Sequence, residues 1–170
     1  SFAIPAPGDS TDLRTDEADD LWTFFGQEGL PGGMFDRAGY PDNTFRGLPE
    51  WDQLLIDQLE KESLFSLTSD VEYRAADSTF NLKADVLAIE EIVGDPINLV
   101  AYLVEDSILT KQLDNGVFID NYVQNHVFRT SFDGMTGEQI TTGSMAQNQL
   151  ITRNYSLKAD PEWKLDKCSV

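Results

Sequence analysis

The stretch from Asp95 to Gly134 most constrains the fold, because it contains the most continuous apolar run of the chain and its only histidine. The run Ile97–Val104 follows a Gly-Asp-Pro break and is apolar on both faces, which predicts a central strand inside a two-layer structure. A long polar connection leads from it to Tyr122–Ser131, which we predict as a second strand.

Further strands are predicted on both sides of this stretch. From Phe80 to Val86 every second residue is apolar, a period of two that a half-buried strand requires. The other predicted strands are Leu64–Tyr73, Gln149–Lys158 with Ile151, Tyr155 and Leu157 facing inward, and the beginning of a last strand at Cys168–Val170. Many short strands separated by turn signals favour an antiparallel β-sandwich of the immunoglobulin-like or jelly-roll kind.

Two helices are predicted before these strands. Thr15 is a favourable N-cap for the first helix, and Asp16 and Glu17 place negative charge at the positive end of its dipole. Pro49 suits the first turn of the second helix, which runs to Lys61. Both helices carry an apolar stripe that we predict to pack in the core: Ala18, Leu21, Trp22 and Phe25 in the first, and Trp51, Leu54, Leu55 and Leu59 in the second.

The ends of the chain and its connections are predicted as irregular structure. Ser1–Ser10 carries two prolines and a Gly-Asp pair and is predicted as a loop, without the pattern of a signal peptide. Gly29–Asn43 is predicted as a turn, one short strand and a loop. No apolar run approaches the roughly 18 residues that a membrane span needs.

The charge of the chain excludes some classes of partner. At 170 residues, the chain has room for one domain or two small ones, and its 41% hydrophobic content is that of a globular protein. Its 30 acidic residues against 12 basic ones give a formal net charge of -18. Such a charge repels phosphates and anionic membrane surfaces, so we predict no binding to nucleic acid.

No group of residues predicts a metal site or catalysis. The acidic cluster of residues 12–20 does not match the EF-hand pattern. In a calcium loop that starts at Asp12, Arg14 would occupy the third position, and Glu17 would occupy the position that requires glycine. Cys168 is the single cysteine, which excludes an internal disulfide and a CxxC pair, and we predict it as a small strand residue. His126 is predicted in mid-strand without a nucleophile beside it. We therefore predict no catalytic residue, no cofactor and no metal ligand.

The aromatic residues of the stretch from Asp95 to Gly134 suggest a contact surface. Some of them are expected to fill the core, and those left exposed would form a patch for a partner. The candidate partner-binding residues are Phe118, Tyr122, His126, Phe128 and Arg129.

The run from Leu99 to Ile140 resembles the twenty-eight-kilodalton outer-membrane-protein family of Bacteroidetes-type bacteria. The resemblance lies in AlaTyrLeuValGluAsp at 101–106, followed by Gln112, Tyr122, Asn125, His126, Val127, Arg129, Gly137, Glu138 and Ile140. The family pattern has a histidine where this chain has Gln124. The resemblance implies a lipoprotein-type protein that is exported and tethered to the outer membrane by an N-terminal lipid anchor outside this chain.

The first half resembles the C-terminal portion of a thioredoxin-like domain, the usual neighbour of this β domain. The similar segments are AspLeuArgThr at 12–15, the helix after it, and LeuProGlyGlyMetPheAspArg at 30–37. Pro31 would then be the cis-proline of that fold, and Trp51 would lie on its closing helix. The opening strand, first helix and CxxC of such a domain are not in these residues. The predicted fold class is thus α+β: a partial thioredoxin-like segment at 1–62 and an antiparallel β-sandwich at 63–170.

These features favour a non-enzymatic binding or adhesion module of the cell envelope. Its partner would be a protein, a peptide or a glycan. One alternative is a thioredoxin-like thiol-disulfide oxidoreductase whose CxxC half lies outside this chain. Another is an envelope protein that calcium stabilises through carboxylates and carbonyls.

Overall fold

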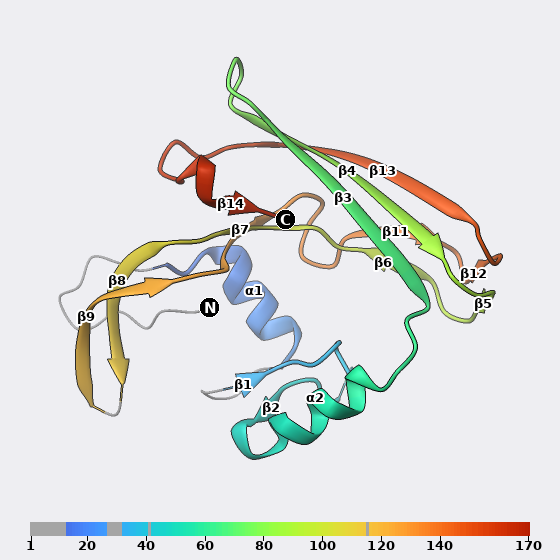
Figure 1. Cartoon of the computed structure of the whole chain (residues 1–170), viewed down its shortest axis with the longest axis horizontal. Helices are drawn as coiled ribbons and strands as arrows, with labels where there is room; N and C mark the ends of the chain where they lie inside the picture. The colour runs from blue at the N-terminus through green and yellow to red at the C-terminus, as the bar shows by residue number, and fades with distance from the viewer. Residues whose placement is uncertain (1–12, 27–31, 41, 115) are drawn as a thin grey trace.

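The computed structural model describes residues 13–26, 32–40, 42–114 and 116–170 (Figure 1). The predicted loop Ser1–Ser10 and the predicted cis-proline Pro31 lie outside these residues. Antiparallel strands are the predominant secondary structure of the described residues, which confirms a β-rich chain with few helices. The elements are α1 (Asp16–Phe24), β1 (Gly32–Gly33), β2 (Arg46–Gly47), η1 (Leu48–Glu50), α2 (Trp51–Leu59), β3 (Phe65–Arg74), β4 (Thr79–Ala88), β5 (Ile92–Val93), β6 (Ile97–Leu99), β7 (Tyr102–Glu105), β8 (Ile108–Asp114), β9 (Val117–Gln124), β10 (Val127–Ser131), β11 (Glu138–Thr141), β12 (Ser144–Met145), β13 (Leu150–Lys158), η2 (Leu165–Lys167) and β14 (Cys168–Ser169).

The largest sheet has the order β13-β4-β3 and is antiparallel throughout. Its central strand β4 buries every even-numbered residue from Phe80 to Ala88, as the period of two predicts. On β13, Ile151, Tyr155 and Leu157 are half-buried on the same side, so their predicted inward direction is confirmed. The inner face of this sheet therefore carries buried apolar residues of β4.

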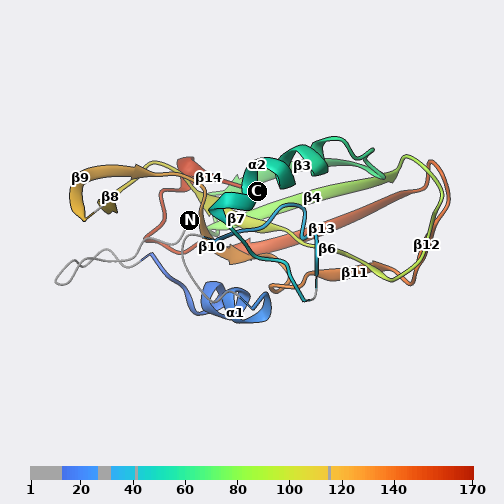
Figure 2. The ribbon, with the colours of Figure 1, turned by 90° about the horizontal axis from the view of Figure 1, so that it is seen from below.

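Smaller antiparallel sheets form a second layer beneath this sheet (Figures 1 and 2). Their orders are β10-β7-β14, β11-β6 and β12-β5. Leu103 and Val127 of this layer have no exposed surface. The antiparallel, β-rich character is therefore confirmed, whereas a β-sandwich of immunoglobulin-like or jelly-roll topology and the thioredoxin-like segment stay predictions.

The run Ile97–Val104 is not one central strand, as the sequence predicted, but two strands with different partners. β6 pairs with β11, whereas β7 pairs with β10 and β14. Between them the Ala101 carbonyl accepts a hydrogen bond from the Phe132 amide at 2.9 Å. The chain changes from one sheet to another at this point. A continuous apolar run is compatible with one long buried strand and with two short ones, so the sequence pattern did not show the division.

The predicted strand Tyr122–Ser131 is also divided, between β9 and β10. His126 has a φ of 53° and lies in the turn, so its predicted place in mid-strand is wrong. Its amide donates a hydrogen bond to the Asp106 carboxylate, and the Asn125 side chain accepts one from the Ser107 amide at 3.0 Å. These side-chain bonds satisfy backbone donors that a continuous ladder would otherwise use.

The first helix forms as its cap predicts. The Thr15 hydroxyl accepts a hydrogen bond from the Ala18 amide at 3.1 Å, and Ala18 is buried. The Glu17 carboxylate accepts hydrogen bonds from the Thr130 hydroxyl and from the amide and hydroxyl of Ser131. These bonds dock α1 on β10.

The predicted core stripe of the second helix is wrong. No residue of α2 is buried, and the exposed fractions of Leu55 and Leu59 are 48% and 76%. The helix has an apolar side that the described part of the chain leaves uncovered. The predicted boundary between residues 62 and 63 falls in the connection from α2 to β3, and the division into two domains stays a prediction. In the described ranges, no helix is both long and apolar enough to span a membrane.

Candidate partner-binding surface

The β8–β9 hairpin projects from the body of the molecule, away from the largest sheet (Figure 1). Among the described residues its two strands form a sheet only with each other. A single two-stranded hairpin is at best marginally stable in water. Its base must therefore be held by contacts with the body, and its tip presents surface on both faces.

The base of the hairpin is fixed by apolar and polar contacts. Ile108 packs with Leu13 and Val127 in a buried cluster. Gln124 is 4% exposed, and its side-chain amide donates hydrogen bonds to Gln112 Oε1 at 2.9 Å and to the Thr110 hydroxyl at 3.5 Å. Burial of these side chains orients the β8–β9 hairpin, which we call the arm.

A bulge in β9 decides which side chains share a face of the arm. The register shifts between Thr110 and Gln112, and Asn121 in the bulge has a φ of 60°. Since Thr110 and Gln112 share a face, their partners Tyr122 and Ile119 share it too. Phe118 is next to Ile119 in the strand, so its side chain lies on the opposite face, and Leu109 and its partner Val123 lie on that face too. Both faces of the arm are apolar and exposed: Leu109 58%, Val117 66%, Phe118 48%, Ile119 40%, Tyr122 41% and Val123 47%.

The five predicted site residues lie on different parts of this region. Phe118 and Tyr122 are on the arm, and His126 is exposed in the turn at its base. Phe128 and Arg129 are half-buried on β10. Phe128 packs edge-on against Tyr102, with ring centroids 5.4 Å apart. The arm therefore carries the aromatic pair that the sequence suggested, whereas β10 belongs to the body.

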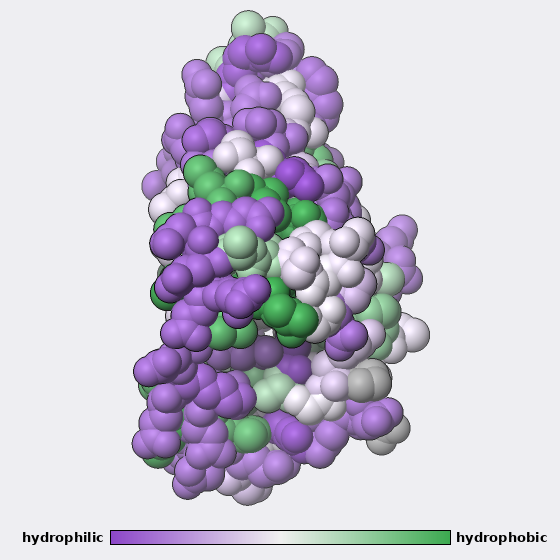
Figure 3. All heavy atoms as spheres, turned by 90° about the vertical axis from the view of Figure 1, so that its right-hand side faces the viewer, coloured by the Kyte–Doolittle hydropathy of each residue, from purple (hydrophilic) through white to green (hydrophobic). Residues whose placement is uncertain are grey.

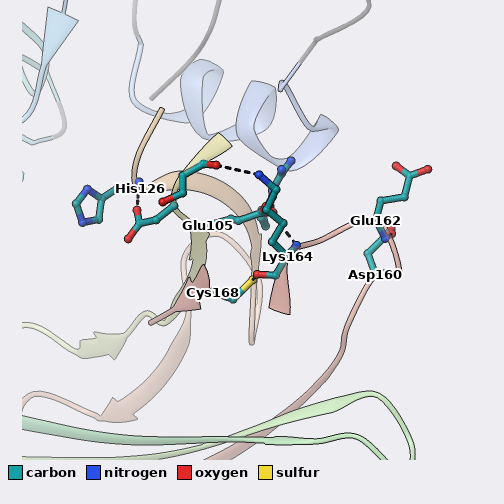
Figure 4. Close-up of polar contacts among 9 residues, drawn as sticks. Glu105, His126, Asp160, Glu162, Lys164 and Cys168 are labelled. Atoms are coloured by element: carbon teal, nitrogen blue, oxygen red, sulfur yellow. Dashed lines mark hydrogen bonds and ion pairs between the residues drawn. The ribbon is translucent and has the colours of Figure 1, made fainter. Parts of the chain in front are cut away.

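Arg129 has a structural partner. Its Nε lies 2.9 Å from Oε2 of Glu105, a side chain that is almost completely buried. The other carboxylate oxygen of Glu105 accepts a hydrogen bond from the Lys164 amide at 3.2 Å (Figure 4). A buried carboxylate needs such a charged partner and further donors. The pair ties β7, β10 and the segment before η2 together.

Cys168 lies beside this cluster, in β14 as predicted (Figure 4). Its Sγ donates a hydrogen bond to the Lys164 carbonyl at 3.5 Å. Burial, reinforced by the negative charge of Glu105, raises the pKa of the Cys168 thiol to about 11. At neutral pH the thiol is protonated, and a protonated thiol is a poor nucleophile. Within the described ranges, no three His, Cys, Asp or Glu side chains gather as metal ligands would.

Sequence reasoning missed two apolar surfaces. Val93 and Leu150 are 80% and 57% exposed at the β5–β12 end of the molecule, where hydrophobic patches interrupt a mainly hydrophilic surface (Figure 3). An apolar groove also runs between the edge strand β3 and residues 99–104. The strand at Leu64–Tyr73 was predicted from the sequence, but the prediction of a strand does not say whether that strand forms the edge of a sheet.

Comparison with family models gives a match over most of the chain. A family model described as outer membrane protein Omp28 matches residues 18–170, from within α1 to the last residue. No curated protein and no solved structure matches the chain. The match includes both the arm and the groove.

Proposed function

The chain belongs to the Omp28 family of outer membrane proteins, and we propose that it is a non-catalytic binding module that engages its partner through the β8–β9 arm. Its place is the outer membrane. We further propose that a lipid anchor outside these residues tethers it, as the resemblance to envelope lipoproteins implies. The partner is a protein, a peptide or a glycan at the cell surface or in the periplasm.

The observation that carries the proposal is the apolar surface of the arm. Large exposed apolar patches on soluble proteins mark interaction sites. Phe118 and Tyr122 supply the aromatic area in which the cores of interfaces are enriched. The buried base, with Ile108 and Gln124, holds the arm in a fixed direction before a partner arrives, so less ordering is needed on binding.

A catalytic role has weaker support. The Cys168 thiol has a raised pKa, and no other cysteine is in the chain. The His126 side chain is exposed, in the turn between β9 and β10. The redox alternative has its own test, which is the reduction of insulin disulfides by the native protein purified from its membrane. Reduction above the uncatalysed rate would contradict a non-catalytic module.

Site-specific photo-crosslinking in native outer membranes tests the proposed surface. A photo-crosslinking amino acid replaces Phe118 or Val123 on the arm, and Glu162, an exposed residue of the body, serves as the matched control. We expect one and the same adduct from both arm positions and none from position 162. Mass spectrometry of the adduct separates a peptide from a glycan. Equal yields at all three positions, or none on the arm, would show that the arm is not the contact surface.

A further inference from the structure

The strand β3 forms an open edge of the largest sheet. In the sheet order β13-β4-β3 it pairs only with β4, over an uninterrupted register of ten residues, within the part of the chain that the structure describes. An edge strand of this length presents unpaired N–H and C=O groups to another chain. Neither a bulge nor a proline protects it.

The hydrogen-bond pattern shows which residues face the open edge. The Ile89 amide donates to the Leu64 carbonyl at 2.9 Å, just beyond the first pair of the ladder, Phe65 and Ala88. In an antiparallel ladder, bonded and non-bonded pairs alternate. The even-numbered residues of β3 therefore exchange bonds with β4. The odd-numbered residues Leu67, Ser69 and Val71 direct their N–H and C=O groups away from the sheet.

An apolar groove of about 350 Å³ lies along this edge. The largest sheet contributes Leu67, Leu82 and Ala84 to it, and the facing layer contributes residues 99–102 and Val104. Leu67 is 64% exposed although its side chain is on the inner face of the sheet. The space beside β3 that would cover it holds no other strand of the described structure.

The opposite edge of the same sheet differs. On β13, Arg153 Nε lies 2.9 Å from the Glu138 carboxylate of β11, and the Tyr155 hydroxyl donates to the same carboxylate at 3.2 Å. These contacts fill the space beneath that edge with side chains of the molecule itself. Within the described residues, the β3 edge combines unpaired backbone groups with an apolar groove.

The charges beside the edge indicate the kind of chain that fits. Asp70 and Glu72 are exposed on the outer face of β3, and the whole chain has a net charge of -18. In a strand added to β3, alternate side chains would enter the groove, and the others would lie beside these two carboxylates. Antiparallel pairing of β3 with β3 of a second copy would bring like charges together, which is unfavourable.

We propose that β3 is a docking edge for an extended segment of a partner protein, which adds to the sheet as a fourth strand. Apolar side chains of the segment fill the groove, and lysine or arginine at alternate positions lies beside Asp70 and Glu72. Backbone hydrogen bonds provide affinity and the groove provides selectivity, as in other cases of strand addition. This site is separate from the β8–β9 arm, so it does not depend on the function proposed above.

Amide exchange with a synthetic peptide tests the proposal. The probe is a capped peptide of ten residues, the length of β3, in which valine and lysine alternate. The control peptide has the same composition with its valines and lysines in two blocks. We expect exchange of the Leu67, Ser69 and Val71 amides to slow at least about tenfold with the alternating peptide only. Equal binding of both peptides, or binding without protection of these amides, would mean attraction by charge alone and would overturn the proposal.

A pair of proline variants separates the edge from general effects on the sheet. Ser69→Pro removes a donor that faces the open edge and leaves the β3–β4 ladder intact. Asn154→Pro is the control on β13. The Ala88 amide donates a hydrogen bond to the Gln149 carbonyl, so odd-numbered residues of this strand bond to β4. The backbone N–H groups of its even-numbered residues, such as Asn154, therefore point away from the sheet. We expect Ser69→Pro to weaken peptide binding at least about tenfold and Asn154→Pro to leave it unchanged. Equal effects of the two would contradict an edge site.

Two further measurements keep the proposal testable if Ser69→Pro unfolds. Leu67→Lys places a charge at the mouth of the groove on a side chain that is already 64% exposed, so the fold should tolerate it and peptide binding should weaken. Sedimentation of the free protein detects the competing outcome. Protection of the β3 amides that grows with protein concentration would show that a second copy occupies the edge, and it would overturn the proposal.

Discussion

Cys168 shows how burial decides the chemistry of a residue that the sequence already described as structural. Its position in β14 was predictable from a short terminal strand pattern. The proximity of Glu105 was not, since 63 positions (168 minus 105) separate the two residues in the chain. Arg129 is a similar case, because its pairing with the buried Glu105 gives a candidate contact residue a structural role.

Alkylation kinetics measure the Cys168 effect. Because the pKa of the folded thiol is about 11 against an ordinary 9.0, the alkylation rate of the folded protein should rise until the pH approaches about 11. In the urea-unfolded chain it should level off near 9. A plateau near pH 9 in the folded protein would contradict the raised pKa of the half-buried Cys168 thiol.

The same shift has a consequence for stability. A raised pKa means that the folded state binds the thiol proton more tightly than the unfolded state does. The stabilisation is complete below pH 9.0 and is lost as the pH rises toward about 11. Cys168→Ser should remove this part of the pH dependence and leave folding and partner binding at neutral pH nearly unchanged.

At the scale of elements, the connection between β10 and β11 shows why the apolar run Ile97–Val104 must divide. Gly137 has a φ of 72°, and an added Cβ would lie 2.0 Å from the Leu99 carbonyl oxygen of β6. β11 starts at the next residue and pairs with β6. This close approach of two backbones fixes β6 to β11 and leaves β7 to pair with β10.

Gly137 and Gly134 form a matched pair for testing this approach. Gly134 has a similar φ of 76°, but nothing lies within 4 Å of its Cβ position. Gly134→Ala should cost about 1–2 kcal/mol, the ordinary penalty of a left-handed residue with a side chain. Gly137→Ala should cost clearly more, because the β6–β11 pairing must also shift. Urea unfolding of the two variants measures the difference, and equal losses would show that the close approach carries no energy.

Across the whole molecule, apolar side chains are divided between a modest core and several exposed surfaces. The even-numbered residues of β4 from Phe80 to Ala88 are buried, whereas α2, Leu67 of β3 and the outer part of the β8–β9 arm leave large apolar side chains exposed. Both proposed binding surfaces follow from this division. The net charge of -18 acts on the whole molecule as well. Repulsion among the acidic residues opposes compaction, and the negative potential attracts cationic partners.

The calcium alternative is tested at this scale. Calcium sites need several oxygen ligands gathered around one ion, and the described carboxylates do not form such a group. We expect the Tm to be the same with and without EDTA, because a protein that holds no calcium loses no stabilising ion to the chelator. A Tm that falls with EDTA and returns on addition of calcium would support a calcium-stabilised protein instead.

The sequence by itself determined what depends on local pattern. The period of two from Phe80 to Val86 predicted β4, and Thr15 predicted the start of α1. Both signals act within one segment of backbone. Only the tertiary structure decided that Ile97–Val104 divides, that Leu59 of α2 is exposed and that β3 is an edge. The physical reason is that strand pairing and burial depend on residues distant in the chain, and the local pattern is compatible with several partners.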